Sequence, residues 1–395
     1  MPQPPPSLKP GAAAGTFGLV ALVVALVVAG LWWVQQRDDP KSSDASDESS
    51  ASTDAGTADP TDDSDEGDDP TDESDDGDGG PGDGSDADPG LGEEAEEIAN
   101  QGFPDDPQVL VISVDGLGSR WVSKSSTPTL ADLLAQGAGT LNARTEVEKT
   151  VTLPNHTGMV TGDRVDAVQG GHGVTWNHTS TQSVALGTQS VFSVISAAGG
   201  SSAVYVGKEK FEMWGRAWPG TIDPLEIGDQ SSLVTDVVED LRAGEHDLVF
   251  LHLAGPDSAG HKYGWGSASY LDAVETADAD IDRVVSAVVD DPGLAEETIV
   301  IVTADHGGVP GTKAHTDRTR SENYTIPFVV WGAGVTPGDL YSLNPDYQDP
   351  GAGRPGYDGP PPIRNGDVAN LVTDLLGLGA VPGSLFDAGH DLDVS

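Results

Sequence analysis

Four nearly uninterrupted apolar runs constrain the fold of this chain more than any other feature. They are rich in Val, Ile and Leu and cover residues 108–114, 247–253, 298–303 and 326–331. A strand buried on both faces, as in a parallel sheet, shows such a run, whereas a strand with one wet face alternates polar and apolar residues. Segments with helical spacing lie between or after these runs, at 129–136, 192–198, 231–241, 269–289 and 367–376. This alternation predicts an α/β fold, with a mostly parallel central sheet and helices on both faces. A shorter strand is expected at 203–206, and a long surface loop at 342–362.

Acidic residues and histidines stand at the ends of these predicted strands. Those that closely follow or precede a strand are Asp115, Asp257, His261, Asp305, His306 and His315. Ligands of open α/β sheets bind beyond the carboxyl ends of the strands, so we expect these side chains to converge. Carboxylates and imidazoles are suitable ligands for zinc and similar metal ions. Taken singly, each residue also fits an ordinary turn, a helix start or a structural histidine. Six such ligands with a nearby hydroxyl fit two metal ions better than one.

The segment 149–156, with the sequence KTVTLPNH, combines hydroxyl residues with a predicted helix start. Pro154 suits the first turn of a helix, where its missing N–H costs nothing. Thr152 would then stand just before the helix N-terminus, where free backbone donors and the helix dipole favour an anion. Two roles are open at this point. Thr152 is either a nucleophile towards phosphorus or a plain helix cap.

The N-terminal quarter differs in composition from the rest of the chain. After a short tail at 1–15, residues 16–34 form an uncharged apolar run with Trp32 and Trp33 near its end. At about 1.5 Å per residue, a helix of this length crosses the hydrocarbon part of a bilayer. We therefore predict one transmembrane anchor rather than a cleaved signal peptide.

The stretch between this anchor and the apolar runs is strongly acidic. Residues 38–97 hold 25 Asp and Glu residues against one Lys, with almost no large apolar side chains. Such a segment cannot bury enough surface to offset its chain entropy. We predict a disordered acidic linker at 35–104 and a folded domain at 105–395, held on the extracytoplasmic side of a cell membrane by the single-pass anchor.

The overall charge and the lack of cysteine exclude several functions. The formal net charge is -46, so nucleic-acid binding, which needs Lys and Arg against the phosphates, is not expected. The chain has no cysteine, which excludes disulfides, Cys-ligated zinc and a thiol nucleophile.

The segments VISVDG, TLPNHTGMVTG, HGVTWN, GPDSAGHKYG and TADHGG occur in this order between residues 111 and 308. Together they resemble the alkaline phosphatase superfamily and, within it, the type I phosphodiesterase/nucleotide pyrophosphatase family. The resemblance covers residues 107–395 and implies a site for two zinc ions. Other divalent metal ions could bind the same ligands. One zinc would be held by Asp115, Thr152, Asp305 and His306, and the other by Asp257, His261 and His315. His390 is the alternative third ligand of the second zinc, because the pyrophosphatases take this histidine from further downstream.

The resemblance also implies a mechanism. Zinc would lower the pKa of the Thr152 hydroxyl, which attacks phosphorus in line and forms a phosphothreonine that water then hydrolyses. Asn177 matches the amide that hydrogen-bonds a non-bridging phosphoryl oxygen, and its alternative role is that of a turn asparagine. Leu153 stands where the pyrophosphatases often have an aromatic residue, which weakens the case for nucleotide stacking. Phe211, Trp214 and Trp218 could supply an aromatic wall for the substrate instead. Their segment fits a buried core or a lid better.

We therefore expect a membrane-anchored, zinc-dependent phosphodiesterase or nucleotide pyrophosphatase that acts on a phosphate ester or nucleotide-like small molecule. The absence of an arginine beside Thr152 favours diesters over monoesters. A phosphomonoesterase, a phosphonate hydrolase and a phosphoryl transferase of the same superfamily are the alternatives. A different class of function is a non-catalytic anchored surface protein, in which the acidic linker is the functional part.

Overall fold

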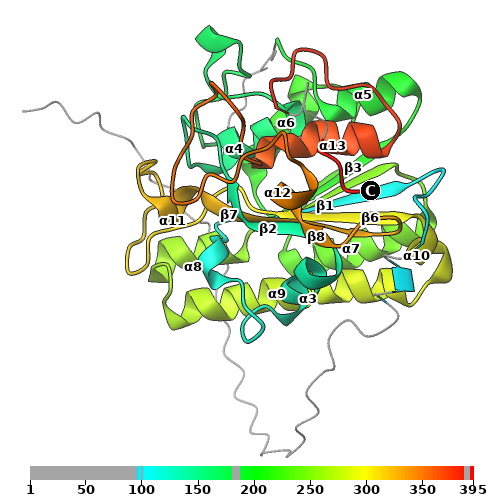
Figure 1. The fold of residues 1–395 in the computed structure, drawn as a ribbon, viewed down its shortest axis with the longest axis horizontal. Helices are drawn as coiled ribbons and strands as arrows, with labels where there is room; N and C mark the ends of the chain where they lie inside the picture. The colour runs from blue at the N-terminus through cyan, green and yellow to red at the C-terminus, as the bar shows by residue number, and fades with distance from the viewer. Residues whose placement is uncertain (1–94, 96, 99–100, 180–186, 387–391) are drawn as a thin grey trace, which may run out of the picture. The chain divides into compact units, whose positions relative to one another are not determined.

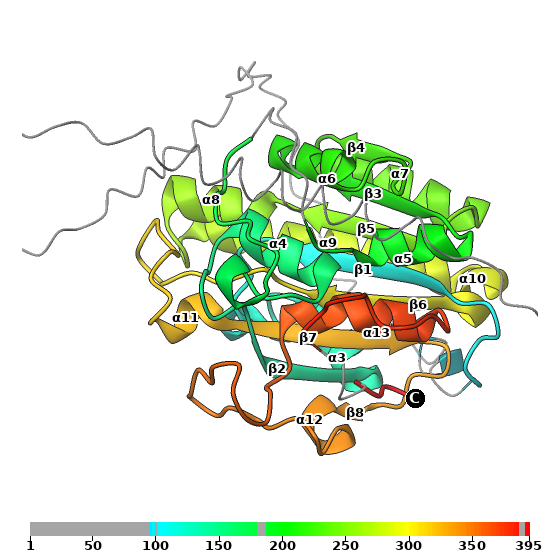
Figure 2. The same ribbon diagram turned by 90° about the horizontal axis from the view of Figure 1, so that it is seen from above.

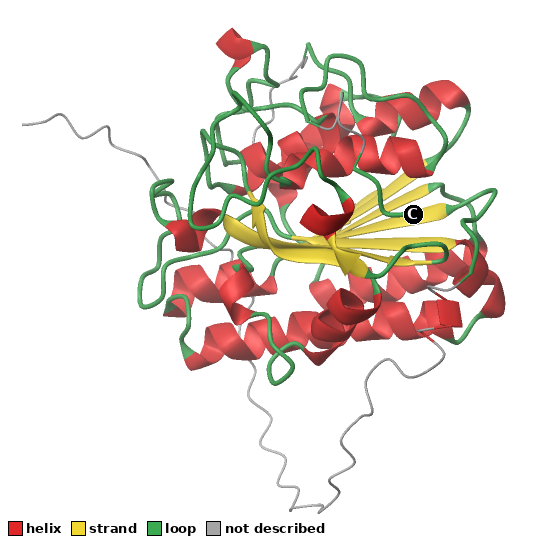
Figure 3. Ribbon diagram, viewed as in Figure 1, coloured by secondary structure: helices red, strands yellow, loops and turns green. Residues whose placement is uncertain are grey.

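The computed structural model describes residues 95, 97–98, 101–179, 187–386 and 392–395. Within these residues eight strands form one sheet, which Figures 1 and 3 show between two layers of helices. In spatial order the strands are β4 (Leu225–Ile227), β3 (Ser202–Val206), β5 (Leu248–Leu253), β1 (Gln108–Val114), β6 (Thr298–Thr303), β7 (Thr325–Gly332), β2 (Ala138–Arg144) and β8 (Gly338–Asp339). All neighbouring pairs are parallel except the two that β7 makes with β6 and β2.

Helices cover both faces of the sheet, as Figures 1 and 2 show. One layer contains α3 (Pro128–Gln136), α7 (Gln230–Ala243), α8 (Gly255–Tyr263), α9 (Ala268–Val289) and α10 (Pro292–Glu297). The other contains α4 (Thr152–Thr161), α5 (Val191–Ala198), α6 (Glu212–Ala217) and α13 (Val368–Leu375). Two short helices, α11 (Ser321–Tyr324) and α12 (Leu340–Leu343), lie beside the β7 and β2 side of the sheet.

The core follows from the apolar runs. Every residue of β1, β5 and β6 is buried, because these central strands have helices on both faces. The longest helix, α9, buries residues that repeat at helical spacing, among them Tyr270, Val274, Ile281 and Val288. The sheet is therefore a rigid support for the loops at its edges.

The predicted fold class is confirmed for the described residues, with several details added. The five predicted strands and five predicted helices are present within a few residues of their expected ends. The antiparallel direction of β7 and the strands β2, β4 and β8 did not follow from the apolar runs, because these three strands are short or carry Gly and polar residues. The predicted surface loop at 342–362 begins with the end of α12 and is not wholly exposed, since Tyr347 is buried.

No helix in the described part of the chain is long and apolar enough to cross a membrane. The predicted transmembrane helix at 16–34 lies outside the described residues, as does most of the predicted linker at 35–104.

Candidate metal centre

The predicted ligand residues lie together at one edge of the sheet. Asp115 follows β1 directly, and Asp257 and His261 lie one turn apart in α8, which begins just after β5. The loop between β6 and α11 carries the other three, Asp305, His306 and His315. Because β7 runs antiparallel to β6, this loop returns to the same edge, which is how a histidine ahead of a strand joins residues that follow strands. The structure thus brings the strand-end residues together.

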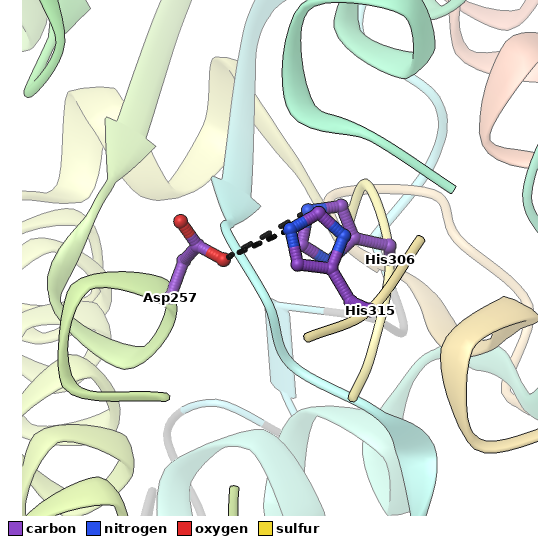
Figure 4. A group of neighbouring side chains, drawn as sticks. All are labelled: Asp257, His306 and His315. Atoms are coloured by element: carbon purple, nitrogen blue, oxygen red, sulfur yellow. Dashed lines mark ion pairs between the residues drawn. The ribbon is translucent and has the colours of Figure 1, made fainter. Parts of the chain in front are cut away.

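Two groups of side chains place their ligand atoms close enough to share a metal ion. In each group one candidate ligand atom per residue lies within 4.8 Å of the others, and the groups are Asp115–Asp305–His306 and Asp257–His306–His315. Figure 4 shows the second group, in which the carboxylate of Asp257 faces the stacked rings of His306 and His315. His261 Nε2 extends this group, at 3.1 Å from His315 Nε2. The alternative ligand His390 lies outside the described residues.

The carboxylates of this site share one pattern, in which the protein holds one oxygen and leaves the other without a partner. Asp305 Oδ1 accepts hydrogen bonds from the Gly116 and His306 backbone N–H groups, at 3.0 and 2.8 Å. The buried atoms at this edge that lack a hydrogen-bond partner within the described structure are Asp115 Oδ1, Asp257 Oδ1, Asp305 Oδ2, His306 Nε2 and Thr152 Oγ1. Each such atom costs about 1–3 kcal/mol if left unsatisfied. Their convergence on one place fits bound cations, which would satisfy all of them.

The histidines follow the same pattern. His306 Nδ1 donates to the Gly307 carbonyl at 3.0 Å, His315 Nδ1 to the Thr150 carbonyl at 2.6 Å, and His261 Nδ1 to the Lys313 carbonyl at 3.1 Å. A carbonyl only accepts, so each of these Nδ1 atoms carries a proton and Nε2 is the atom left to bind a cation. The Nε2 atoms of His261 and His315 lie 3.1 Å apart, and a cation between or beside them would satisfy both.

Burial and neighbouring charges set the protonation of these groups. Burial lowers the pKa of His306, and burial together with the adjacent His306 lowers the pKa of His315 to about 3, so both rings are neutral. Burial also opposes ionisation of Asp115, but Lys208 and His252 hold its pKa well below the usual range. Burial, and then the Asp115 and Asp257 carboxylates, raise the pKa of Asp305. A bound cation would offset the charge of Asp305, which is the least compensated of the three.

Thr152 is the first residue of α4, and its hydroxyl is buried without a partner. The N-cap residue is Val151, and no side chain caps the helix from that position. The helix-cap interpretation of Thr152 is therefore wrong, because its side chain makes no capping bond. Asn177 caps the helix instead, since its Oδ1 accepts from the Leu153 N–H at 3.0 Å. This bond places Asn177 beside the start of α4, next to Thr152.

Lys208 and His252, which the sequence did not single out, hold the acidic ligands. Lys208 Nζ lies 2.9 Å from Asp115 Oδ2 and 2.5 Å from Asp257 Oδ2. His252 Nε2 donates to Asp115 Oδ2 at 2.9 Å, because its Nδ1 accepts from the Gly207 N–H at 3.2 Å. Lys208 follows β3 by two residues, so including lysine in the strand-end criterion would have identified it. His252 lies inside β5 and gives no such signal.

Gly116 allows two of the carboxylates to approach each other. Its φ of 77° lies in the left-handed region, and a Cβ there would be 2.9 Å from Asp257 Cα. The close passage of α8 therefore explains why residue 116, directly after Asp115, is a glycine.

Two buried asparagines brace the loops of the site. Asn155 donates to two backbone carbonyls of the loop before Thr152 and accepts from the Glu146 N–H at 2.9 Å. Asn365 donates to the Asp305 carbonyl at 3.2 Å and to Asn155 Oδ1 at 3.3 Å. The pair links the Thr152 loop to the Asp305 turn. Asn155 lies within TLPNHTGMVTG, one of the segments that carried the resemblance, but no spacing rule indicated this role for either asparagine.

The aromatic residues considered as a substrate wall belong mainly to the core. Phe211, Trp214 and Trp218 are buried and pack together with Phe192. Trp265 is also buried, although its ring packs at 5.2 Å from that of His261. The core interpretation of 211–218 is therefore the correct one.

A buried carboxyl beside the Thr152 loop gives a pH-dependent prediction. Burial raises the pKa of Glu146 to about 8, against the opposing effects of the Tyr357 hydroxyl and Arg364. The unfolded chain releases this proton near 4.5, so the folded state binds more protons than the unfolded state between these values. Stability therefore falls as the pH rises through this window. Glu146→Gln, a neutral isostere, should raise the melting temperature by about 2–5 °C at pH 8 and by less at pH 5.

Calorimetry at both pH values measures this effect, and Glu148→Gln is the matched control. Glu148 pairs with Arg164 at 2.6 Å, so losing its charge should not stabilise the protein at pH 8. The difference in melting temperature between Glu146→Gln and the parent should be larger at pH 8 than at pH 5. An equal or smaller difference at pH 8 would contradict a buried, protonated Glu146.

Comparisons with known proteins show what this chain is similar to. Residues 109–356 match the sequence profile of the family described as Type I phosphodiesterase / nucleotide pyrophosphatase. A stretch of 163 residues, or 39% of this chain, is 33% identical to GPI ethanolamine phosphate transferase 1 of Yarrowia lipolytica and covers 16% of that protein. Another stretch of 86 residues, or 22% of the chain, is 41% identical to the protein of the same name from Candida glabrata and covers 9% of it. The chain thus spans less than a fifth of the length of these relatives.

Solved structures share the fold at low sequence identity. Murine ectonucleotide pyrophosphatase / phosphodiesterase 5 superposes with a TM-score of 0.52 and 15% identity, over 70% of this chain and 96% of that one. The lipoteichoic acid synthase LtaP from Listeria monocytogenes gives a TM-score of 0.51 and 15% identity, over 75% and 76% of the two chains. These two likenesses show an alkaline phosphatase-like fold. By the match over 109–356, the chain belongs to the type I phosphodiesterase/nucleotide pyrophosphatase family.

Proposed function

We propose that this protein is a two-zinc phosphoryl-transfer enzyme, in which Thr152 is the nucleophile towards a phosphodiester and an alcohol is the acceptor. The observation that carries the proposal is the convergence of carboxylate and imidazole atoms that have no hydrogen-bond partner in the described structure. The Thr152 hydroxyl is also buried without a partner, and His156, one turn further along the same helix, lies 3.6 Å from Asp305 Oδ2. A hydroxyl nucleophile beside metal ions is suited to attack a phosphorus ester, because the metal ions activate the hydroxyl and stabilise the charge on the phosphoryl group.

The donor set fits zinc. One ion would be held by Asp115, Thr152, Asp305 and His306, and the other by Asp257, His261 and His315. Neutral imidazoles and single carboxylate oxygens at one place are the donors that zinc takes in four-coordinate protein sites. Bound there, zinc would lower the pKa of the Thr152 hydroxyl and offset negative charge on the reacting phosphoryl group.

The chain's own residues supply the rest of the reaction. The Thr152 oxygen forms a bond to phosphorus, the bond from phosphorus to the leaving alcohol breaks, and that alcohol departs with a proton. The hydroxyl of the acceptor then attacks the phosphothreonine, which restores the Thr152 side chain. Asn177 Oδ1 accepts from the Leu153 N–H at the start of α4, and in this proposal its amide N–H donates to a non-bridging phosphoryl oxygen, where charge develops in the transition state.

The acceptor distinguishes the proposed transferase from the phosphodiesterase or pyrophosphatase that the sequence favoured. Transfer to an alcohol is supported by the relatives named GPI ethanolamine phosphate transferase 1, and it points to a lipid-linked or glycan-linked substrate. Transfer to water, as in a phosphodiesterase or pyrophosphatase, is supported by the description of the family. Both reactions use the same phosphothreonine and differ in what attacks it.

Phosphorus NMR distinguishes the two acceptors. The purified protein with zinc is incubated with bis(p-nitrophenyl) phosphate and with ethanolamine or glycerol as added alcohol. The proposal predicts a new phosphodiester that contains the added alcohol, with a yield that rises with its concentration. If p-nitrophenyl phosphate is the product at every alcohol concentration, the protein is a hydrolase and the transferase proposal fails.

We also propose that residues 16–34 anchor this domain to a membrane, with 35–104 as a spacer. The support is the uncharged apolar run and the acidic stretch after it. Extraction of membranes at alkaline pH should leave the full chain in the pellet and release a chain without residues 1–34. Release of both proteins would contradict the anchor.

A further inference from the structure

Lys208 lies between two carboxylates that the proposed centre assigns to different metal ions. Its Nζ contacts Asp115 Oδ2 at 2.9 Å and Asp257 Oδ2 at 2.5 Å. The side chain is only 12% exposed, so these two contacts occur largely out of water. A buried ammonium with two such partners is fixed in place, since leaving any of the three charges unpaired would be costly.

The oxygens that Lys208 does not contact point towards the histidines. Asp115 Oδ1 lies 3.6 Å from His306 Nε2. Asp257 Oδ1 lies 3.5 Å from His261 Nε2 and 3.9 Å from His315 Nε2. Both of these oxygens are buried without a hydrogen-bond partner. Each carboxylate is therefore divided, with one oxygen for the ammonium and one for the centre.

From this division we propose that Lys208 is a positioning residue that limits Asp115 and Asp257 to one oxygen each and so selects small cations over large ones. The role rests on the proposed function. Zinc takes about four N or O ligands, for which single carboxylate oxygens suffice. Calcium takes about 6–8 oxygen ligands and often binds both oxygens of a carboxylate. A carboxylate whose second oxygen is held by Lys208 cannot offer that second ligand.

The two ligands depend on Lys208 to different degrees. Asp115 Oδ2 has a second donor, His252 Nε2, at 2.9 Å, so Asp115 stays oriented when the lysine is removed. Asp257 Oδ2 is paired with Lys208. Within α8, His261 lies near the other oxygen of this carboxylate, Oδ1, and so does not hold Oδ2. Loss of Lys208 should therefore affect the Asp257 cation more than the Asp115 cation.

The test is titration of the metal-free full chain with zinc and with calcium by isothermal calorimetry, for the parent and for Lys208→Met. The parent should bind two zinc ions. In Lys208→Met one of the two zinc steps, that of the ion held by Asp257, should lose about 10–100-fold in affinity, the range seen when outer-shell partners are removed. The other zinc step should change by less than about threefold, and the ratio of zinc to calcium affinity at the affected step should fall at least tenfold.

Two further variants make the result decisive. Lys208→Gln keeps a donor for one carboxylate and should give a smaller loss at the same step, which also covers the case in which Lys208→Met does not fold. Lys262→Met removes an exposed ammonium that stacks on Tyr263, next to His261, and should leave both zinc steps unchanged. It therefore controls for a general loss of positive charge near the site.

The possible failures are distinguishable. A parent chain that binds no pair of zinc ions would overturn the proposed function and this role together. Two zinc ions in the parent with unchanged or tighter binding in both Lys208 variants would overturn this role alone, since the ammonium would then only repel the cations. Equal losses at both steps would also contradict it, because His252 should protect Asp115.

Discussion

Thr152→Ala should lower turnover of a phosphodiester by at least about 10⁴-fold, because it removes the nucleophile on which both chemical steps depend. The substitution deletes a hydroxyl that is buried and has no hydrogen-bond partner in the described structure. The fold should therefore be retained, with a melting temperature close to that of the parent. Rates with bis(p-nitrophenyl) phosphate at saturating zinc, together with thermal melts, measure both effects.

Two variants show whether the loss belongs to the hydroxyl. Thr152→Ser keeps an oxygen at the same position and should recover a measurable part of the rate. Thr157→Ala, in the same helix, removes a methyl group and the bond from the Thr157 hydroxyl to the Leu153 carbonyl and should stay within about threefold of the parent rate. A Thr152→Ala protein with the parent rate would contradict the assignment of Thr152 as the nucleophile and favour a non-catalytic surface protein or a direct attack by water.

His306→Ala should have the second large effect, since His306 belongs to both groups of candidate ligands. We expect bound zinc to fall from two ions to at most one per chain, and the rate to fall by at least about 10³-fold. A chelator should inactivate the parent to the same degree. Added zinc should restore the parent and leave His306→Ala inactive. Elemental analysis of the purified proteins gives the metal content, and the diesterase assay gives the rate.

His246→Ala is the matched control for this change. His246 is bound to Asp240 at 2.7 Å and to the Asp223 carbonyl at 2.8 Å, and it is not a member of either ligand group. This variant should keep two zinc ions and the parent rate. If His306→Ala retained both ions, the two-ion site would be built from other residues.

The sequence predicted the fold because its central strands are buried on both faces. The runs at 108–114, 247–253 and 298–303 had to be apolar throughout, and they were recognised within a residue or so of β1, β5 and β6. The direction of β7 could not be predicted in this way. An apolar run carries no information about direction, and the loop of 304–320 that precedes β7 has neither a helix nor a strand to indicate how the chain returns.

The site was predictable where its residues stand at strand ends, as Asp115, Asp257 and Asp305 do. Residues that act through others were not. His252 lies within the apolar run of β5, which hides it in the sequence, although its ring binds Asp115 in the structure. The position of Thr152 before Pro154 suggests a cap, yet α4 begins at Thr152 itself, one residue earlier than a cap requires. Contacts between segments far apart in the chain, such as Asn177 with Leu153, have no local signal.

Anomalous diffraction at the zinc absorption edge counts the ions of the proposed centre and locates their ligands in one experiment. A two-zinc centre should give two zinc peaks about 3.5–4 Å apart. One should be bound by Asp115, Thr152, Asp305 and His306, and the other by Asp257, His261 and His315. A single peak, no peak at this edge of the sheet, or a second ion bound by His390 in place of His315 would contradict it.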